Sequence, residues 1–226
     1  MAKTTIRNIR TLSLAELETW FEELGEKKFR AKQVYEWLWL KQAQSFDAMT
    51  NLSKELRQRL SATFTLPALT VDATQYSADG TVKSRFKTHD GHLVEGVLIP
   101  TEERKTACVS SQIGCSLSCR FCATGYIDRK RNLDFDEIYD EVVLINQQSE
   151  RIYDQKLTNI VFMGMGEPLL NYKNVMKAIE RITSPDGLGM SPRRITVSTA
   201  GVAKQIRQLG DDKSKIQTRA VTTCRQ

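Results

Sequence analysis

The first 64 residues place apolar side chains at helical spacing. Leu14, Leu17 and Phe21 recur three or four residues apart, which predicts an amphipathic helix. Ser13 followed three residues later by Glu16 is the pattern of a helix N-terminus, because each group can satisfy the other's backbone N–H. Similar patterns predict two more helices, near residues 30–41 and from about residue 53. We therefore expect a small helical domain over residues 1–66.

Residues 70–100 have a different pattern, rich in β-branched side chains. The segments 70–76, 81–87 and 93–99 are separated by Ala78-Asp79-Gly80 and by Asp90-Gly91. Short Asp-Gly sequences between apolar segments are strong signals for hairpin turns. The pattern predicts a three-stranded antiparallel meander, which we assign with its linker to residues 67–105.

From residue 106 onward, short apolar runs alternate with amphipathic stretches. Such alternation is typical of a parallel sheet covered by helices, because inner parallel strands are buried on both faces. The predicted fold class is therefore α/β, a partial (β/α) barrel over residues 106–226. Active sites of such folds lie in the loops that follow the strands. The predicted strands are 107–110, 157–163 and 195–198, and the predicted helices are 135–146, 172–183 and one that ends near 209.

Composition and charge narrow the class of protein. The chain has 226 residues and a formal net charge of +6, a moderately basic balance that permits a nucleic-acid partner without requiring one. No stretch has the length and apolarity of a signal peptide or a membrane span. Five cysteines, three of them clustered, do not form the pattern of a secreted disulfide framework. We expect a cytoplasmic protein without a membrane partner, and a monomer.

The clustered cysteines carry the clearest chemistry. Cys115, Cys119 and Cys122 follow the spacing C-x3-C-x2-C in a loop after the first parallel strand. Thiolates are soft ligands that select iron–sulfur groups, zinc or Cu(I). Three of them can hold three irons of a [4Fe–4S] cluster and leave the fourth open to a substrate. A zinc site that uses His89 or His92 as a fourth ligand, and an electron-transfer iron–sulfur protein, are the alternatives.

Two further loops follow predicted strands at the same edge of the sheet. Gly164-Met165-Gly166-Glu167-Pro168 offers glycines that allow close backbone approach, and a carboxylate that can accept a hydrogen bond from an ammonium or a hydroxyl group. Ser198 ends the next strand. A tight turn with a solvated Glu167, and a helix-capping Ser198, would explain the same residues without a ligand.

Four motifs in order resemble the radical S-adenosylmethionine (SAM) RNA adenine-C2 methyltransferases. The resemblance extends from about Ser13 to Gly210, and the cysteine spacing alone resembles the wider radical SAM superfamily. The motifs are Cys108-Val-Ser-Ser-Gln-Ile-Gly-Cys115-Ser-Leu-Ser-Cys119-Arg-Phe-Cys122-Ala-Thr-Gly, then Arg131-Asn-Leu, then Gly164-Met-Gly-Glu-Pro-Leu, then Arg194-Ile-Thr-Val-Ser198-Thr-Ala-Gly.

The resemblance implies a role for each matching residue. It implies that Cys115, Cys119 and Cys122 bind a [4Fe–4S] cluster, and that Gly166, Glu167 and Ser198 contact SAM. It further implies that Glu95 is the proton acceptor, and that Cys108 is a thiol that helps to resolve a transient protein–RNA adduct.

The same resemblance implies the partners. They are 23S rRNA, tRNA and an electron donor such as flavodoxin, and the N-terminal helical domain is the one that resembles an RNA-binding module. We favour C2 of adenine over C8, the position that a related branch methylates, because the N-terminal domain and the cluster flanks are more similar to the C2 branch.

The last residues depart from the family pattern. The family continues further and carries a methyl-bearing cysteine, a role that we do not give to Cys224 because no matching motif surrounds it. The polar segment 215–226 is unsuited to an inner strand, so we expect an open sheet edge. A codon set that encodes residues 215–226 can be read, with a one-base frameshift that starts inside Ser214, as the family-like Pro-Lys-Phe-Lys-Leu-Ala-Leu-Ser-Leu-His-Ala-Ala. We therefore expect a frameshifted, C-terminally truncated form without methyltransferase activity of its own, or else a zinc- or iron–sulfur-binding RNA module without catalysis.

Overall fold

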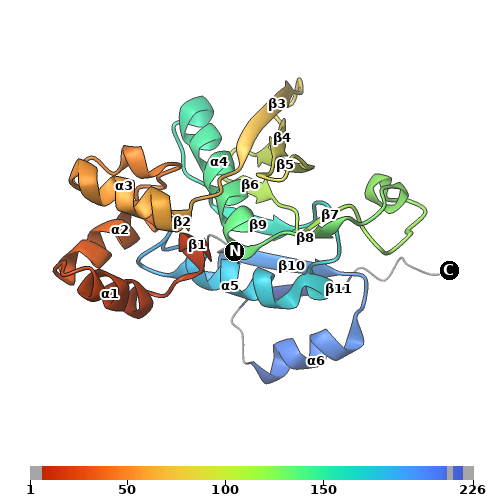
Figure 1. The fold of residues 1–226 in the computed structure, drawn as a ribbon. Helices are drawn as coiled ribbons and strands as arrows, with labels where there is room; N and C mark the ends of the chain where they lie inside the picture. The colour runs from red at the N-terminus through yellow and green to blue at the C-terminus, as the bar shows by residue number, and fades with distance from the viewer. Residues whose placement is uncertain (1–6, 213–215, 221–226) are drawn as a thin grey trace. The chain divides into compact units, whose positions relative to one another are not determined.

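The computed structural model describes residues 7–212 and 216–220, and it divides into two compact units. The first unit holds the described residues up to Ala68 together with Pro185–Leu188, and the second holds the others. Each unit is described by itself below (Figure 1). Among the described helices, none combines the length and the apolarity needed to cross a membrane.

The first unit is helical, in agreement with the apolar periodicity. Ser13 forms the predicted capping box, because its hydroxyl oxygen accepts the Glu16 N–H and the Glu16 carboxylate accepts the Ser13 N–H at 2.8 Å. Leu17, Phe21 and Trp39 are fully or almost fully buried in its core. Its elements are β1 (Arg7–Asn8), η1 (Ile9–Thr11), α1 (Leu14–Glu23), α2 (Phe29–Trp39), η2 (Phe46–Ala48), α3 (Lys54–Thr63) and β2 (Phe64–Thr65).

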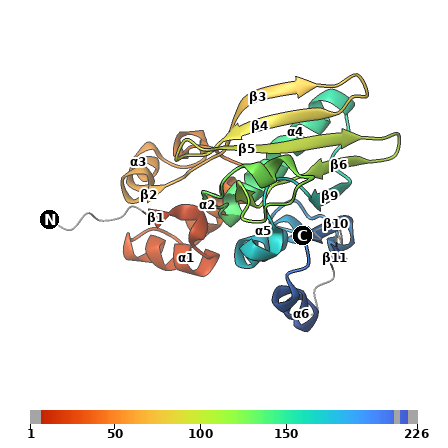
Figure 2. The same cartoon turned by 90° about the vertical axis from the view of Figure 1, so that its right-hand side faces the viewer.

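The second unit is built on a seven-stranded sheet of described residues, in the order β11-β10-β9-β6-β5-β4-β3. The strands β3 to β6 pair antiparallel, and β6, β9, β10 and β11 pair parallel (Figure 2). The predicted meander is therefore confirmed, and it continues directly into the parallel strands as one sheet. The strands are β3 (Thr70–Tyr76), β4 (Val82–Lys87), β5 (Leu93–Pro100), β6 (Lys105–Cys108), β9 (Asn159–Phe162), β10 (Ile195–Thr199) and β11 (Gln217–Ala220).

Helix α4 (Phe135–Tyr153) covers one face of this sheet. Gly96 on β5 makes the close approach possible, because a Cβ there would lie 2.6 Å from a Glu141 oxygen and 2.9 Å from Ile145. Buried Phe86 and Ala107 point to this covered face, and their strand neighbours point to the other face. The remaining elements are η4 (Pro168–Asn171), α5 (Tyr172–Thr183), η5 (Pro192–Arg194) and α6 (Ala203–Asp211).

A small hairpin carries the cysteine loop. Strand β7 (Gln112–Ile113) pairs antiparallel with β8 (Arg131–Asn132), and the loop between them includes the short helix η3 (Ala123–Tyr126). These two-residue strands were not predicted, because a periodicity needs a longer segment to be visible. The hairpin holds both ends of the cysteine loop at the sheet.

The end of the described chain corrects one expectation. Residues 217–220 form β11, which pairs parallel with β10 from Thr196 to Thr199, so the sheet does not end at the third parallel strand. The polarity argument was wrong here because an edge strand is held by main-chain hydrogen bonds and tolerates polar side chains. Residues 213–215 and 221–226, which include Cys224, lie outside the described residues.

Candidate active site

A cavity of about 220 Å³ lies where three loops meet at the carboxyl ends of the parallel strands. The cysteine loop forms one wall, the loop after β9 forms a second and the end of β10 forms a third. Six of the residues singled out in the sequence line this cavity: Cys115, Cys119, Cys122, Gly166, Glu167 and Ser198. Glu95 and Cys108 do not line it.

Main-chain hydrogen bonds shape the cysteine loop. The Cys115 N–H donates to the Ile127 carbonyl at 3.1 Å, and the Cys122 N–H donates to the Cys119 carbonyl at 3.1 Å. Gly125 packs on the loop so closely that a Cβ would lie 2.7 Å from the Cys119 oxygen. The fold of the loop therefore presents three half-buried thiols toward one cavity.

The donor set of the cavity fits an iron–sulfur group. Its lining holds three soft thiol ligands, and the Leu117 N–H donates to Cys115 Sγ at 3.4 Å, a contact that favours a charged sulfur. Among the described residues, neither histidine lines the cavity. His89 lies 3.5 Å from a Glu137 carboxylate oxygen and His92 lies 3.9 Å from Asp90. The geometry therefore does not support a zinc site of three cysteines and one histidine.

Glu167 joins two walls of the cavity. One of its carboxylate oxygens accepts the Ala200 N–H at 2.7 Å, and the other accepts the Leu169 N–H at 3.0 Å. The side chain is almost completely buried. A carboxylate has about four acceptor positions, so these two bonds leave acceptor capacity for a cationic group in the cavity.

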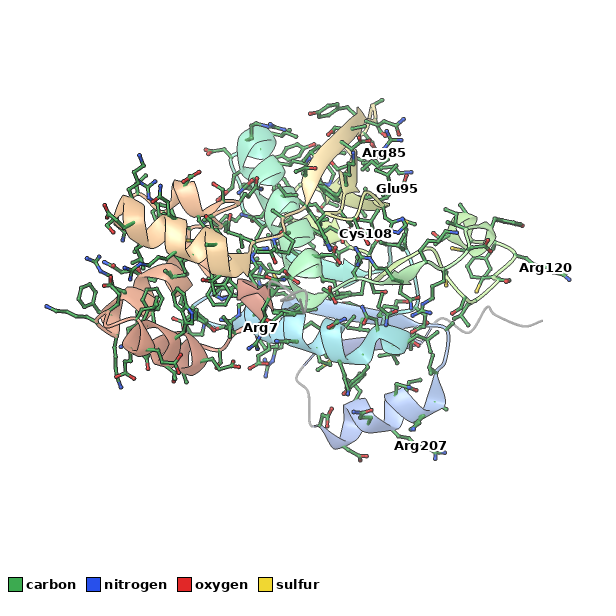
Figure 3. All side chains as sticks on the ribbon, in the orientation of Figure 1. Arg7, Arg85, Glu95, Cys108, Arg120 and Arg207 are labelled. Carbon is green, nitrogen blue, oxygen red and sulfur yellow. The ribbon has the colours of Figure 1, made fainter. Side chains whose placement is uncertain are left out.

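Glu95 and Cys108 lie on the open face of the sheet, opposite the face that α4 covers. Cys108 pairs with Val97 on β5 and with Val161 on β9, and Glu95 follows two residues before Val97 on the same face (Figure 3). The Glu95 carboxylate lies 2.8 Å from the Lys83 ammonium. The register thus places these two residues on one surface, beside the strands whose ends form the cavity.

Comparison with family models shows which protein family the chain resembles. Residues 7–66 match the ribosomal RNA large subunit methyltransferase N-terminal domain, and residues 109–214 match the radical SAM superfamily. The chain belongs to the RlmN family of radical SAM RNA methyltransferases.

Individual relatives agree with this family. A probable dual-specificity RNA methyltransferase RlmN from Cytophaga hutchinsonii is 60% identical over 92% of this chain, and a dual-specificity RNA methyltransferase RlmN from Geotalea uraniireducens is 45% identical over 90%. The crystal structure of a radical SAM methyltransferase from Sphaerobacter thermophilus superposes on this chain with a TM-score of 0.85 and 38% sequence identity. The superposition covers 95% of this chain and 63% of the Sphaerobacter chain. The chain spans 57% of the length of each of the two RlmN relatives.

The glycines of this RlmN-family site serve packing within the protein. A Cβ on Gly164 would lie 2.5 Å from Ser110 Oγ, and one on Gly166 would lie 2.5 Å from the Gln112 side chain. Gly166 also has a φ of +93°, which side-chain-bearing residues rarely adopt. The sequence interpretation stressed approach to a ligand, and the structure adds that the loop after β9 must first fit against residues 110–112.

Two buried polar residues that the sequence analysis did not single out hold the loops together. Ser110 Oγ donates to the Glu95 carbonyl at 2.7 Å and accepts the Met165 N–H at 2.8 Å. Gln112 accepts the Glu167 N–H at 3.0 Å and donates to Asn132 at 2.7 Å. Both lie inside the first quoted motif, between Cys108 and Cys115, and this position was the available signal.

Arg131, part of the quoted motif, ties three segments together. Its guanidinium donates to both oxygens of Asp90, at 2.7 and 2.9 Å, and to both oxygens of Glu137, at 2.6 and 2.7 Å. The Arg131 hydrogen bond holds the pKa of the Asp90 carboxyl well below its usual range. This clamp fixes the β4–β5 turn and the start of α4 against the hairpin that carries the cysteines.

Burial controls the ionisation of Cys108. Desolvation, and secondly the charge of Glu141, raises the pKa of its thiol to about 11. Glu141 is itself buried on α4, where desolvation raises its pKa well above the ordinary range, although both carboxylate oxygens accept the Ser110 N–H at 3.1 Å. Cys108 is therefore protonated at neutral pH.

Proposed function

We propose that this chain belongs to a protein that methylates C2 of adenine in 23S rRNA and tRNA by radical SAM chemistry, and that it carries the part that binds the cluster and SAM. One observation carries the proposal. Three thiols from one loop, and Glu167 and Ser198 from the ends of two parallel strands, line the same cavity. A substrate held at an open iron would meet a carboxylate and a hydroxyl group within that space.

In this proposal the chain's own residues have distinct tasks. Cys115, Cys119 and Cys122 hold a [4Fe–4S] cluster, which supplies the electron that cleaves SAM when both are bound. Glu167 binds the ammonium group of SAM with its remaining acceptor positions, and Gly166 and Ser198 complete the contacts. Apolar side chains that line the cavity, among them Leu117 and Phe162, exclude water from it.

Glu95 and Cys108 act on the RNA in this proposal. Glu95 accepts the proton that leaves the adenine carbon, and the nearby Lys83 ammonium holds its carboxylate in place. Cys108 resolves the transient protein–RNA adduct. Because its thiol is protonated at neutral pH, the thiol has to give up its proton as it attacks.

The partners and the compartment follow from this chemistry. The substrates are 23S rRNA and tRNA, and an electron donor such as flavodoxin reduces the cluster. The protein works as a monomer in the cytoplasm, where thiols remain reduced. Adenine C2 is an electron-poor carbon, which explains the need for a radical rather than ordinary transfer of a methyl group from SAM.

Metal analysis after anaerobic reconstitution with iron and sulfide tests the proposal. We expect about four irons per chain, in line with one cubane cluster, and loss of the iron chromophore in each of Cys115→Ala, Cys119→Ala and Cys122→Ala. Cys108→Ala is the matched control and keeps its iron. A triple variant that retains full iron, or a protein that takes zinc in its place, would contradict the assignment.

Product analysis tests the reaction itself. With a chemical reductant, the reconstituted chain is expected to release 5′-deoxyadenosine from labelled SAM, weakly, and to leave unmodified rRNA unlabelled. The complete protein, expressed in parallel, is expected to label adenine C2. Label at C8, or no label from the complete protein, would refute the proposed reaction, and RNA labelled by this chain alone would refute the proposed division of tasks.

A further inference from the structure

The cysteine loop exposes three large apolar side chains, and one of them, Phe121, also lines the cavity. Tyr126 is 79% exposed, Phe121 65% and Ile127 47%, and all three lie within seven consecutive residues. Clustered exposed apolar side chains mark interaction sites more often than single ones do. No element of the described chain covers these side chains.

Cationic residues flank this apolar group in the chain. Arg120, Arg129 and Lys130 are exposed on the same loop, and Asp128 is the one exposed acidic residue among them. Hydrogen bonds fix the arrangement, because the Tyr126 hydroxyl donates to the Arg120 carbonyl at 3.1 Å and Arg129 donates to Asn132 at 3.0 Å. The loop therefore presents exposed apolar and basic side chains together, and these two hydrogen bonds hold part of it in place.

We propose that this surface, the loop tip, docks an acidic one-electron carrier protein that reduces the cluster. The loop tip consists of Arg120, Phe121, Tyr126, Ile127, Arg129 and Lys130. The inference rests on the proposed function, because only a cluster that must be reduced needs such a partner. Small interfaces with an apolar centre and complementary charges are typical of transient redox encounters, where charge mainly raises the association rate.

The position of the loop tip favours a redox partner over RNA. The reacting adenine has to reach Glu95 and Cys108 on the open face of the sheet, whereas Arg120 lies at the outer end of the loop, away from both (Figure 3). The loop tip is instead part of the same short segment as the three thiols. Arg120 and Phe121 stand between Cys119 and Cys122 in the chain, so a partner seated there lies beside the segment that carries the cluster ligands.

The electron balance of the step is simple. With a cluster bound, the reduced flavin of a flavodoxin-type carrier would give up one electron to it, without a change in any covalent bond. Docking therefore has to bring the flavin near the thiols only briefly. A weak, salt-sensitive complex meets this need.

The test compares a loop-tip variant with a matched surface variant. Tyr126→Ser combined with Lys130→Glu removes apolar area and reverses one charge of the loop tip. Arg207→Glu, on exposed helix α6 away from the loop, is the charge-reversal control (Figure 3). Iron content and thermal unfolding first establish that each variant is loaded and folded.

Two readouts then use an acidic bacterial flavodoxin as the probe. Calorimetry measures its affinity for the chain before and after reconstitution, and stopped-flow absorbance measures how fast its fully reduced form bleaches the cluster. We expect the loop-tip variant to lose at least tenfold in affinity and in the second-order rate constant, and the Arg207→Glu variant to match the parent. Reduction by dithionite should be equal in all three proteins.

Three other results would count against the docking proposal or against the proposed function. Unchanged flavodoxin affinity and rate in the loop-tip variant would overturn the proposal. Weaker binding of a 23S rRNA hairpin with unchanged flavodoxin binding would assign the surface to RNA and also overturn it. Failure of dithionite to produce 5′-deoxyadenosine in every protein would count against the proposed function, while the affinity comparison would still decide on the docking site.

Discussion

The side-chain oxygen of Gln112 accepts the backbone N–H of Glu167 at 3.0 Å, and this bond joins the cysteine hairpin to the loop after β9. Gln112 is completely buried, and its amide nitrogen donates to Asn132 on the other strand of the hairpin. One side chain thus links the segment that carries the thiols to the segment that carries the carboxylate. The two walls of the cavity cannot shift independently without breaking this link.

Replacement of Gln112 by leucine is expected to weaken both the fold and the proposed SAM site. The Glu167 N–H would lose its acceptor in a buried position, at a cost of about 1–3 kcal/mol in the free energy of unfolding. Urea denaturation measures this loss, and calorimetry with SAM on the reconstituted protein measures the accompanying fall in affinity. Gln208→Leu, an exposed position on α6, is the matched control and should change stability by less than about 0.5 kcal/mol. Equal effects of the two substitutions would contradict the linking role.

Glu167→Gln should be nearly as harmful as removal of the side chain. Both carboxylate oxygens accept backbone N–H groups, from Leu169 and from Ala200, and an amide can accept only one of them. Its NH₂ group would then face an N–H donor, so we expect a loss of about 1–3 kcal/mol in unfolding free energy and SAM affinity at least tenfold lower. Glu180→Gln on the exposed side of α5 provides the control. Unchanged SAM affinity in Glu167→Gln would remove Glu167 from the proposed contacts.

The sequence predicted those parts of the fold that have local signals. The capping box at Ser13 and the amphipathic pattern of 172–183 each place an element correctly, because hydrogen-bond partners and apolar faces lie within a few residues of one another. Helix α4 extends to Tyr153, beyond the predicted end at residue 146. The added turns hold polar Gln148, which is buried because it exchanges hydrogen bonds with Ser84 on β4, a partner that is distant in sequence.

The candidate site likewise contains residues that the sequence predicted and residues that it did not. The motifs identified the cavity residues, because ligand chemistry constrains residue type and spacing. The supporting residues Ser110 and Gln112 were not predicted, because their partners Met165 and Glu167 lie 55 residues away in the chain. The roles of Glu95 and Cys108 remain predictions, although the strand register places them on one surface.

Glu141→Gln is expected to raise stability at neutral pH. Desolvation raises the pKa of the Glu141 carboxyl in the folded state above its value in the unfolded chain, so the folded state binds more protons between those two values. Stability therefore falls as pH rises through that window, and the loss persists above it. Glutamine still accepts the Ser110 N–H but has no charge to desolvate.

Urea denaturation between pH 4 and pH 8 measures this effect. The stability of Glu141→Gln relative to the parent should increase with pH from about 4.5, the ordinary glutamate value, and should be largest at the upper end. Glu150→Gln, exposed on the same helix, should show no such trend. If the difference in stability between Glu141→Gln and the parent does not change with pH, groups other than Ser110 stabilise the charged Glu141 carboxylate in the folded state.

Alkylation of Cys108 should follow a pH profile shifted to the alkaline side. Only the thiolate reacts, and burial raises the pKa of this thiol to about 11, so its rate with iodoacetamide should rise about tenfold per pH unit from pH 7 to 9.5 without a plateau. The same cysteine in the urea-unfolded chain should begin to level off above pH 9.0, the ordinary thiol value. Mass spectrometry separates its peptide from those of the other cysteines. Glu141→Gln should move the folded-state profile toward lower pH, because the charge of Glu141 is the second cause of the shift. A plateau below pH 9 in the folded protein would show that the thiol is ionised more easily than its burial implies, and would allow Cys108 to attack without first losing its proton to a base.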